Sequence, residues 1–139
     1  MTQNNVAETL ARISLEIGAI KFSPDQPFTW ASGYKMPIYN DNRLFLGNAG
    51  HRTLITQGFQ DLLKKCAAKI EVIAGTATAG IPHATTFADH LQLPLIYVRS
   101  ATKTHGMGNQ VEGLLYKNQQ VIVIEDLIST GGSVANAVT

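Results

Sequence analysis

Cysteine is almost absent from this 139-residue sequence, which contains only Cys66. A single cysteine cannot form a disulfide within the chain, and this usage suits a reducing cytosol. Charged residues are also scarce, at 15% of the total, and the formal net charge of +1 lacks the basic excess typical of nucleic-acid binders. The composition therefore argues against a disulfide scaffold and against a nucleic-acid partner.

Long hydrophobic runs are missing as well. No apolar stretch approaches the roughly 20 residues of a membrane-spanning helix. The polar start, MTQNNVAETL, has no positive segment followed by an apolar one, as a signal peptide would have. We expect a soluble, cytoplasmic protein with no membrane partner. The length suits a single domain, and a hydrophobic content of 45% is enough for a packed core.

The first 45 residues predict a small hood made of a helix and a hairpin. Asn5, with a glutamate three residues later, is typical of a helix start. Apolar residues then recur at spacings of three and four, which predicts a helix with one apolar stripe: Val6, Leu10, Ile13, Ile17 and Ile20. The stretch KFSPDQPFTWASGYKMPIYND predicts two extended segments, residues 28–31 and 37–39, joined by a turn at residues 32–33.

Residues 46–139 predict an α/β core. The helical period returns over residues 48–66, and its apolar face consists of Ile55, Phe59, Leu62 and Cys66. Short apolar strands then alternate with helices, which indicates an open, mainly parallel sheet with helices on both faces. The predicted strands are residues 71–74, 94–98 and 121–124, with a brief extended piece at 114–116. A last helix begins at Gly132 and has only two turns, so we expect the C-terminal part of this core to be missing.

The loop EDLISTGGS follows the strand VIVI, and its chemistry has two parts. Hydroxyls and glycines at residues 129–133, at the start of a helix, present backbone N–H groups that suit a phosphate. Glu125 and Asp126 would repel a phosphate but accept hydrogen bonds from sugar hydroxyls, or hold Mg²⁺. The pattern predicts a site for a phosphorylated sugar, with an ordinary strand-to-helix turn as the alternative. Neither GxxxxGK[ST] nor GxGxxG occurs, which argues against the common nucleotide-binding loops.

Two more loops leave the same predicted edge of the sheet, where open parallel sheets bind their ligands. GTATAGIP allows close backbone approach to an anion, although a tight turn would look similar. RSATKTHGMGNQVEG carries Arg99, Lys103 and His105 among three glycines, which suits a lid over a charged leaving group, or a solvated surface loop. His83 and His90 lie two turns apart on one predicted helix, but no third metal ligand joins them.

Three stretches resemble one enzyme family. VIVIEDLISTGGSV resembles the phosphoribosyl pyrophosphate signature of type I phosphoribosyltransferases. FTWASGYKMPIYND looks like the N-terminal segment of the orotate phosphoribosyltransferase family, and RSATKTHGMGNQVEG looks like its catalytic loop. The resemblance runs from Phe22 to the end of the chain.

The resemblance implies an activity. A glycosyltransferase of this family moves the 5-phosphoribosyl group from phosphoribosyl pyrophosphate to orotate, giving orotidine 5′-monophosphate and pyrophosphate in pyrimidine (UMP) biosynthesis. It uses Mg²⁺, carried by the substrate close to Glu125 and Asp126 rather than held by a dedicated set of protein ligands. The resemblance also implies a homodimer in which each catalytic loop reaches into the neighbouring subunit's site.

The resemblance assigns roles residue by residue. Glu125 and Asp126 would hold the ribose hydroxyls. The loop around the 5′-phosphate would consist of Ser129, Thr130, Gly131, Gly132 and Ser133. The pyrophosphate loop would consist of Thr76, Ala77, Thr78 and Ala79. Together with Asp126, the catalytic residues would be the cations that neutralise the leaving pyrophosphate: Arg99, Lys103 and His105. Lys35 would help to contact the substrates, and Phe28 and Trp30 would border the orotate ring, although packing is the simpler role for Trp30.

The sequence also departs from the family pattern. Ala31, Ala79 and Ser100 stand where many members carry lysine, which places more of the pyrophosphate charge on Arg99 and Lys103. The arginine with which the family binds the orotate carboxylate lies beyond the last residue of this chain.

Two alternatives to the orotate enzyme stay open. The first is a phosphoribosyltransferase that acts on a purine, since a different base site would leave the signature unchanged; the stretch FTWASG argues against it. The second is a regulatory protein that senses phosphoribosyl pyrophosphate without transfer. Lys103 and His105 argue against this second alternative, because a sensor has less need of cations that face pyrophosphate.

Overall fold

A computed structural model describes residues 3–30, 32–100 and 109–139. The chain divides into two compact units, Met1–Gly58 and Phe59–Thr139. The boundary at Gly58 lies inside a helix, whereas the sequence places the end of the hood at residue 45.

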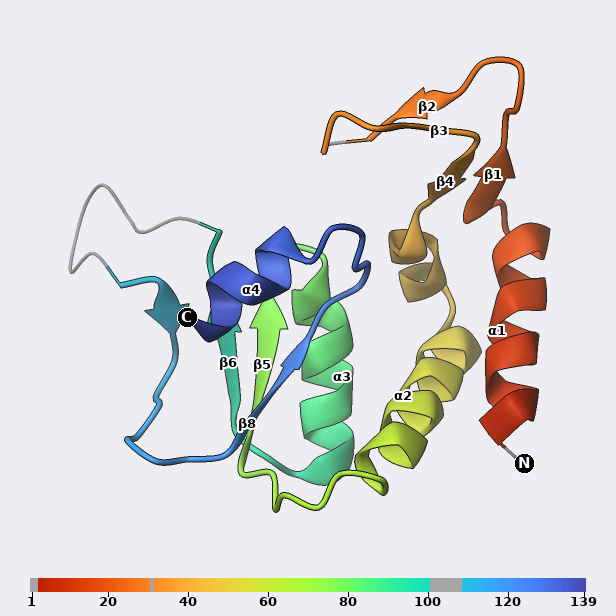
Figure 1. Cartoon of the computed structure of the whole chain (residues 1–139). Helices are drawn as coiled ribbons and strands as arrows, with labels where there is room; N and C mark the ends of the chain where they lie inside the picture. Colours follow the sequence, from red (N-terminus) through yellow and green to blue (C-terminus); the bar gives the residue numbers. More distant parts are fainter. Residues whose placement is uncertain (1–2, 31, 101–108) are drawn as a thin grey trace. The chain divides into compact units, whose positions relative to one another are not determined.

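The first unit is built from short elements (Figure 1). In chain order they are α1 (Gln3–Glu16), β1 (Ile20–Phe22), β2 (Phe28–Thr29), β3 (Lys35–Met36), β4 (Ile38–Asn40), the 3-10 helix η1 (Asn42–Gly47) and α2 (Ala49–Leu63). Strand β1 pairs with β4, and β2 pairs with β3, both in antiparallel fashion. The predicted hood of a helix and a hairpin is therefore present.

Helix α1 differs from the prediction at both ends. It begins at Gln3, before the expected cap at Asn5, and ends at Glu16. Including Ile17 and Ile20 in its apolar stripe was wrong. Gly18 adopts a φ of +73°, a left-handed conformation that commonly follows the end of a helix. Ile20 instead opens β1, where it pairs with Asn40 of β4.

The hairpin also differs from the prediction. Its second strand is β3, not residues 37–39, and β4 (Ile38–Asn40) belongs to the other two-stranded sheet. Pro37 lies between β3 and β4 and has no N–H group to donate to a ladder, so the two strands are separate. Its carbonyl accepts a hydrogen bond from the N–H of Ser23 at 2.8 Å.

Helix α2 ends at Leu63, three residues earlier than predicted. Leu62 and Cys66 are exposed, so placing them on one apolar face with Phe59 was wrong. Phe59, which was predicted, and Leu63, which was not, pack against the core of the second unit. The ring centroids of Phe59 and Phe87 are 5.5 Å apart.

The second unit is a four-stranded sheet with helices. It contains β5 (Val72–Thr76), α3 (Gly80–Leu91), β6 (Leu95–Val98), β7 (Val111–Glu112), β8 (Val121–Ile124) and α4 (Gly132–Val138). The strand order is β7-β6-β5-β8, in which β6, β5 and β8 are parallel and β7 is antiparallel. The predicted mainly parallel sheet is confirmed. The extended piece expected at residues 114–116 was misplaced, because pairing with β6 selects Val111 and Glu112.

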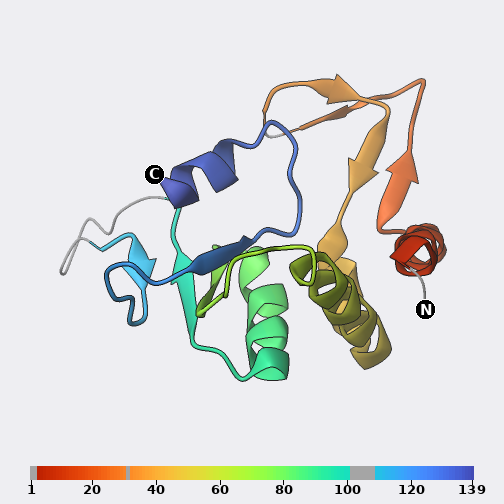
Figure 2. The same ribbon diagram turned by 60° about the horizontal axis from the view of Figure 1, so that its bottom comes forward.

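Alternating side chains of the strands build one core layer on each face of the sheet. Ile73 and Ile124 pack with Ala84 and Phe87 of α3 on one face. Val72 and Ala74 pack on the other face, where Ala137 of α4 joins them. The two helices therefore contact opposite faces, as Figures 1 and 2 show.

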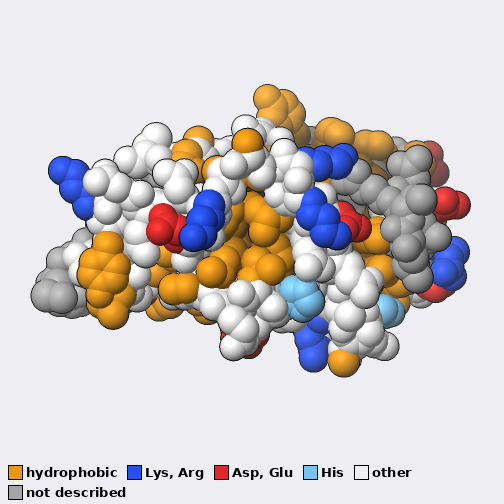
Figure 3. Space-filling model, turned by 90° about the horizontal axis from the view of Figure 1, so that it is seen from below, with side chains coloured by type: hydrophobic (Ala, Val, Ile, Leu, Met, Phe, Trp, Pro, Cys, Tyr) orange, Lys and Arg blue, Asp and Glu red, His pale blue; other side chains and the backbone are white. Residues whose placement is uncertain are grey.

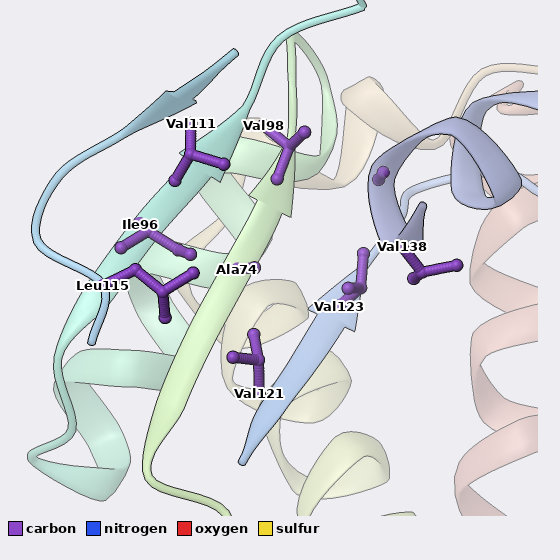
Figure 4. Close-up of a pocket in the computed structure, with 9 residues that line it drawn as sticks. Ala74, Ile96, Val98, Val111, Leu115, Val121, Val123 and Val138 are labelled. Atoms are coloured by element: carbon purple, nitrogen blue, oxygen red, sulfur yellow. The ribbon is translucent and has the colours of Figure 1, made fainter. Parts of the chain in front are cut away.

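A pocket of about 260 Å³ lies on the α4 face of the sheet. Figure 4 shows that its walls are aliphatic side chains from the strands, from α4 and from Leu115 in the segment after β7. Neither the acid pair, Glu125 and Asp126, nor the glycine-containing loop at residues 129–133 lines it. None of the lining side chains is polar, which favours an apolar occupant over a phosphate or a sugar. No helix in the described parts of the chain is long and apolar enough to cross a membrane.

Candidate functional site

The register of the parallel strands brings the three predicted loops to one edge of the second unit. Thr76 of β5 pairs with Val98 of β6, and Gly75 pairs with Ile124 of β8. The N–H of Ala77 donates to the Val98 carbonyl at 2.8 Å. The chain therefore leaves β5, β6 and β8 at neighbouring points, as the sequence predicts for a ligand-binding edge.

The acid pair begins directly at the end of β8. Glu125 and Asp126 are both half-buried, and the N–H of Asp126 donates to Oε1 of Glu125 at 3.1 Å. Burial raises the pKa of Glu125, the neighbouring Asp126 carboxylate raises it further, and a hydrogen bond from Thr76 opposes both effects. The raised pKa of Glu125 means that the protein stabilises its charged form incompletely, which favours hydroxyl donors or a cation as partners of this carboxylate.

These carboxylates also fit Mg²⁺, because they supply adjacent oxygen atoms of the kind this ion prefers. Among the described residues, however, no group of three histidine, cysteine, aspartate or glutamate side chains could form a complete metal site.

The glycine-containing loop leads into α4. Gly131 precedes the helix with a φ of +81°, a conformation that favours glycine. Its carbonyl accepts a hydrogen bond from the N–H of Ala135 at 2.9 Å, which closes the first turn. Ser129, Thr130 and Ser133 are exposed. The first N–H groups of a helix have no partner within the helix, so the loop presents donors and hydroxyls to solvent.

The residues of the β5 loop differ in exposure. Thr78 is exposed, and Ala77 and Ala79 are half-buried. Thr76 is only 4% exposed, so its side chain turns into the protein. Of the two hydroxyls in GTATAGIP, only that of Thr78 is open to a ligand.

His83 was not predicted to lie near the acid pair. It is buried in α3, and burial lowers the pKa of its imidazole while the charge of Asp126 raises it. His90 is exposed, so the two histidines do not share an environment. The helical spacing of Gly80, His83, Ala84 and Phe87 is the signal that could have placed His83 on the buried face.

Arg99 lies where the loop after β6 begins. Its backbone N–H donates to the Gln110 carbonyl at 2.9 Å, and its Nη1 lies 3.7 Å from Oε1 of Glu112 in β7. The predicted site residues Lys103 and His105 lie outside the described residues. Of the three predicted cations of this loop, Arg99 lies within the described residues, and Glu112 is its ion-pair partner.

Both ends of this loop are tied to α4. Nδ2 of Asn136 donates to the Ser100 carbonyl at 3.3 Å. Nε2 of Gln110 donates to the Asn136 carbonyl at 3.3 Å. Asn136 thus joins the base of the loop to the helix that follows the glycine-containing loop. No pattern in the sequence signals these contacts.

Three predicted site residues lie in the first unit. The Phe28 ring lies 5.5 Å from that of Tyr39. The indole N–H of Trp30 donates to the Ile38 carbonyl at 2.9 Å, so this edge of the ring is tied to β4. Lys35 is exposed. Ala31, one of the three departures from the family pattern, lies outside the described residues.

Charges of both signs are interspersed on the face seen in Figure 3. Lysine and arginine side chains on this face do not form a continuous basic patch.

The sheet, its edge loops and the acid pair define the class of protein. The model of the phosphoribosyl transferase domain matches residues 49–139, and the chain belongs to this family. The identifying stretch thus covers α2 and the whole of the second unit.

Within the phosphoribosyl transferase family, the chain is similar to orotate phosphoribosyltransferases. Over 133 residues, or 96% of this chain, the sequence is 54% identical to an orotate phosphoribosyltransferase of Streptococcus mutans. The chain spans 64% of that relative's length. Among solved structures, the orotate phosphoribosyltransferase of Aeropyrum pernix is 31% identical with a TM-score of 0.72, and the match covers 93% of this chain and 71% of that one. The UMP synthase of Leishmania donovani is 29% identical with a TM-score of 0.78, over 94% of this chain and 27% of that one.

Proposed function

We propose that this protein is an orotate phosphoribosyltransferase. It transfers the 5-phosphoribosyl group from phosphoribosyl pyrophosphate to orotate, giving orotidine 5′-monophosphate and pyrophosphate, in cytoplasmic pyrimidine biosynthesis. The observation that carries the proposal is the edge of the second unit. There an acid pair suited to ribose hydroxyls is followed directly by a loop suited to a phosphate, in a chain 54% identical to an enzyme of that name.

In this proposal the residues act by binding and orienting rather than by attacking the substrate. Glu125 and Asp126 accept hydrogen bonds from the ribose hydroxyls, and the loop from Ser129 to Ser133 holds the 5′-phosphate. Thr78 and the backbone of Ala77 and Ala79 face the pyrophosphate. Fixing both ends of the sugar phosphate holds the anomeric carbon in place for the incoming base.

The leaving group sets the remaining requirement. Bond breaking gives the sugar oxocarbenium character and places negative charge on pyrophosphate, so cations must stabilise it. When bound with the substrate, Mg²⁺ neutralises part of this charge, and Glu125 and Asp126 are the residues that would lie close to it. Arg99, Lys103 and His105 supply the remaining positive charge. Arg99 lies at the base of the loop, where its Nη1 is 3.7 Å from Oε1 of Glu112.

A turnover assay on the intact protein with phosphoribosyl pyrophosphate and Mg²⁺ tests the proposal. Orotate, adenine and xanthine are supplied in separate reactions, and pyrophosphate release is measured. Pyrophosphate release is expected in the reaction that contains orotate and not in the reactions that contain adenine or xanthine. Release with adenine or xanthine instead would establish the purine alternative, and tight binding without release would establish the regulatory one.

We also propose a homodimer in which the loop that carries Lys103 serves the partner's site. Two variants of the intact protein, Lys103→Ala and Asp126→Asn, are each expected to be nearly inactive. When the subunits exchange, about half of the dimers are mixed, and one site in each mixed dimer has no lesion. About a quarter of all sites should therefore regain activity. If mixed dimers form, as shown by mass, and no activity returns, the loop serves its own subunit.

A further inference from the structure

Three segments meet at one buried point behind the acid pair. They are the last residue of β5, the first residue of α3 and the end of β8. The Thr76 side chain fills this point, and its hydroxyl donates to the Ile124 carbonyl at 3.3 Å, across 48 residues of sequence. The carbonyl that accepts this bond belongs to the residue just before Glu125.

Gly80 makes this meeting possible. A Cβ atom at Gly80 would lie 2.6 Å from the Ile124 carbonyl oxygen and closer still to the Thr76 hydroxyl. Any side chain at this position would therefore separate the helix from the two strand ends. Because no space remains, the position of the Thr76 hydroxyl fixes the position of the β8 end.

The Thr76 hydroxyl also reaches the first carboxylate of the acid pair. Its hydrogen bond with Glu125 partly offsets the effect of burial, which raises the pKa of that group. A hydroxyl has one proton, so it can donate to the Ile124 carbonyl or to the Glu125 carboxylate, but not fully to both. Both acceptors are on the segment that carries the acid pair.

We propose that Thr76 is a positioning residue for the acid pair and not a contact for pyrophosphate. Its buried hydroxyl holds the end of β8 and the Glu125 carboxylate where the pair meets the ribose hydroxyls. The inference rests on the proposed function. It departs from the family expectation for this loop, because Thr76 is 4% exposed whereas Thr78 is exposed.

Two fragments of the substrate separate the two roles. Binding of ribose 5-phosphate and of pyrophosphate, each with Mg²⁺, is measured by calorimetry on the intact protein. Thr76→Val keeps the shape and removes the hydroxyl, and Thr76→Ser keeps the hydroxyl as the matched control. For the valine variant, the Kd of ribose 5-phosphate should rise about three- to tenfold, as for the loss of one hydrogen bond. Pyrophosphate binding should stay within about twofold, and the serine variant should bind both fragments like the wild type.

A second substitution identifies the route of the effect. In Glu125→Ala, which removes the side-chain acceptor, replacing Thr76 by valine should weaken ribose 5-phosphate binding less than it does in the wild type, because only the bond to the Ile124 carbonyl remains to be lost. If the valine variant does not fold, Thr76→Ala removes the hydroxyl with a smaller side chain and gives the same comparison.

Each remaining outcome has a definite meaning. A loss of pyrophosphate binding with ribose 5-phosphate unaffected would show that Thr76 contacts pyrophosphate and would overturn the inference. Unchanged binding of both fragments to a folded valine variant would overturn it too. If the wild-type protein binds neither fragment, the proposed function itself fails, and the inference fails with it.

Discussion

Replacing Gly80 by alanine tests the close packing behind the acid pair. The added Cβ would lie 2.6 Å from the Ile124 carbonyl oxygen, whereas ordinary contact begins at 3.4 Å, so this carbonyl would have to retreat by about 0.8 Å. Overpacking of a core costs about 1–3 kcal/mol, and loss of the Thr76 hydrogen bond adds about 0.5–1.5 kcal/mol. Alanine returns at most about 1 kcal/mol through its helix propensity. With the full propensity gain deducted, the free energy of unfolding should therefore fall by about 0.5–3.5 kcal/mol.

Urea denaturation of the wild type and the variant measures this difference. The slope of the unfolding free energy against urea concentration should not change. Gly132→Ala is the matched control for stability. Gly132 is likewise the first residue of its helix, α4, but the nearest atom to an added Cβ is the Thr130 hydroxyl at 4.0 Å. The control should change the stability by no more than about 0.5 kcal/mol. Equal stability of Gly80→Ala and the wild type, or equal losses in both variants, would refute the packing argument.

Three further changes probe the site and the core. Asp126→Asn should weaken phosphoribosyl pyrophosphate binding by about 1.5–3 kcal/mol in calorimetry, since a charge-assisted hydrogen bond is lost; unchanged affinity would remove Asp126 from the ribose site. Burial lowers the pKa of His83 below 6.5 in the folded protein. Between that lowered pKa and pH 6.5, the unfolded chain therefore binds more protons than the folded protein. The contribution of the neutral, buried His83 to stability is thus full above pH 6.5 and is lost as the pH falls. In denaturation curves measured at several pH values, His83→Gln should lose this part of the acid dependence of stability. An unaltered acid dependence would contradict the assignment. Phe87→Ala should cost about 3–5 kcal/mol of unfolding free energy, whereas Leu62→Ala, at an exposed position, should cost less than about 0.5 kcal/mol; similar losses would contradict the observed core.

The parallel sheet could be predicted because its strands carry their own signal. Residues such as Ile73 and Ala74 face opposite sides of β5, yet both are buried, so the strand reads as a continuous apolar run. The loops at the carboxyl edge follow from that assignment, since parallel strands end on the same side. The sequence therefore predicts Glu125 and Asp126 at the same edge of the sheet as the β5 loop.

The short elements could not be predicted in the same way. Ile20 continues the spacing of the α1 stripe, and only the turn at Gly18 and pairing with Asn40 place it in a strand. Likewise, β7 has two residues, and its position depends on pairing with β6 rather than on its own composition. Elements of this size are determined by tertiary contacts that a local pattern does not contain.

The same limit applies to the interior of the site. The sequence places Thr76 in a loop with three other small residues and gives no reason to separate it from Thr78. Its inward direction depends on the absence of a side chain at Gly80 and on the nearby end of β8, which is 48 residues away along the chain. Long-range packing of this kind appears only in the folded structure.

A crystal structure of the intact protein with phosphoribosyl pyrophosphate and Mg²⁺ tests the central claim most directly. The claim predicts that the ribose hydroxyls lie within hydrogen-bonding distance of the Glu125 and Asp126 carboxylates. It also predicts that the 5′-phosphate lies on the backbone N–H groups of residues 130–133. A phosphoribosyl pyrophosphate molecule bound away from this edge of the sheet, or bound with its pyrophosphate in the 129–133 loop, would contradict it.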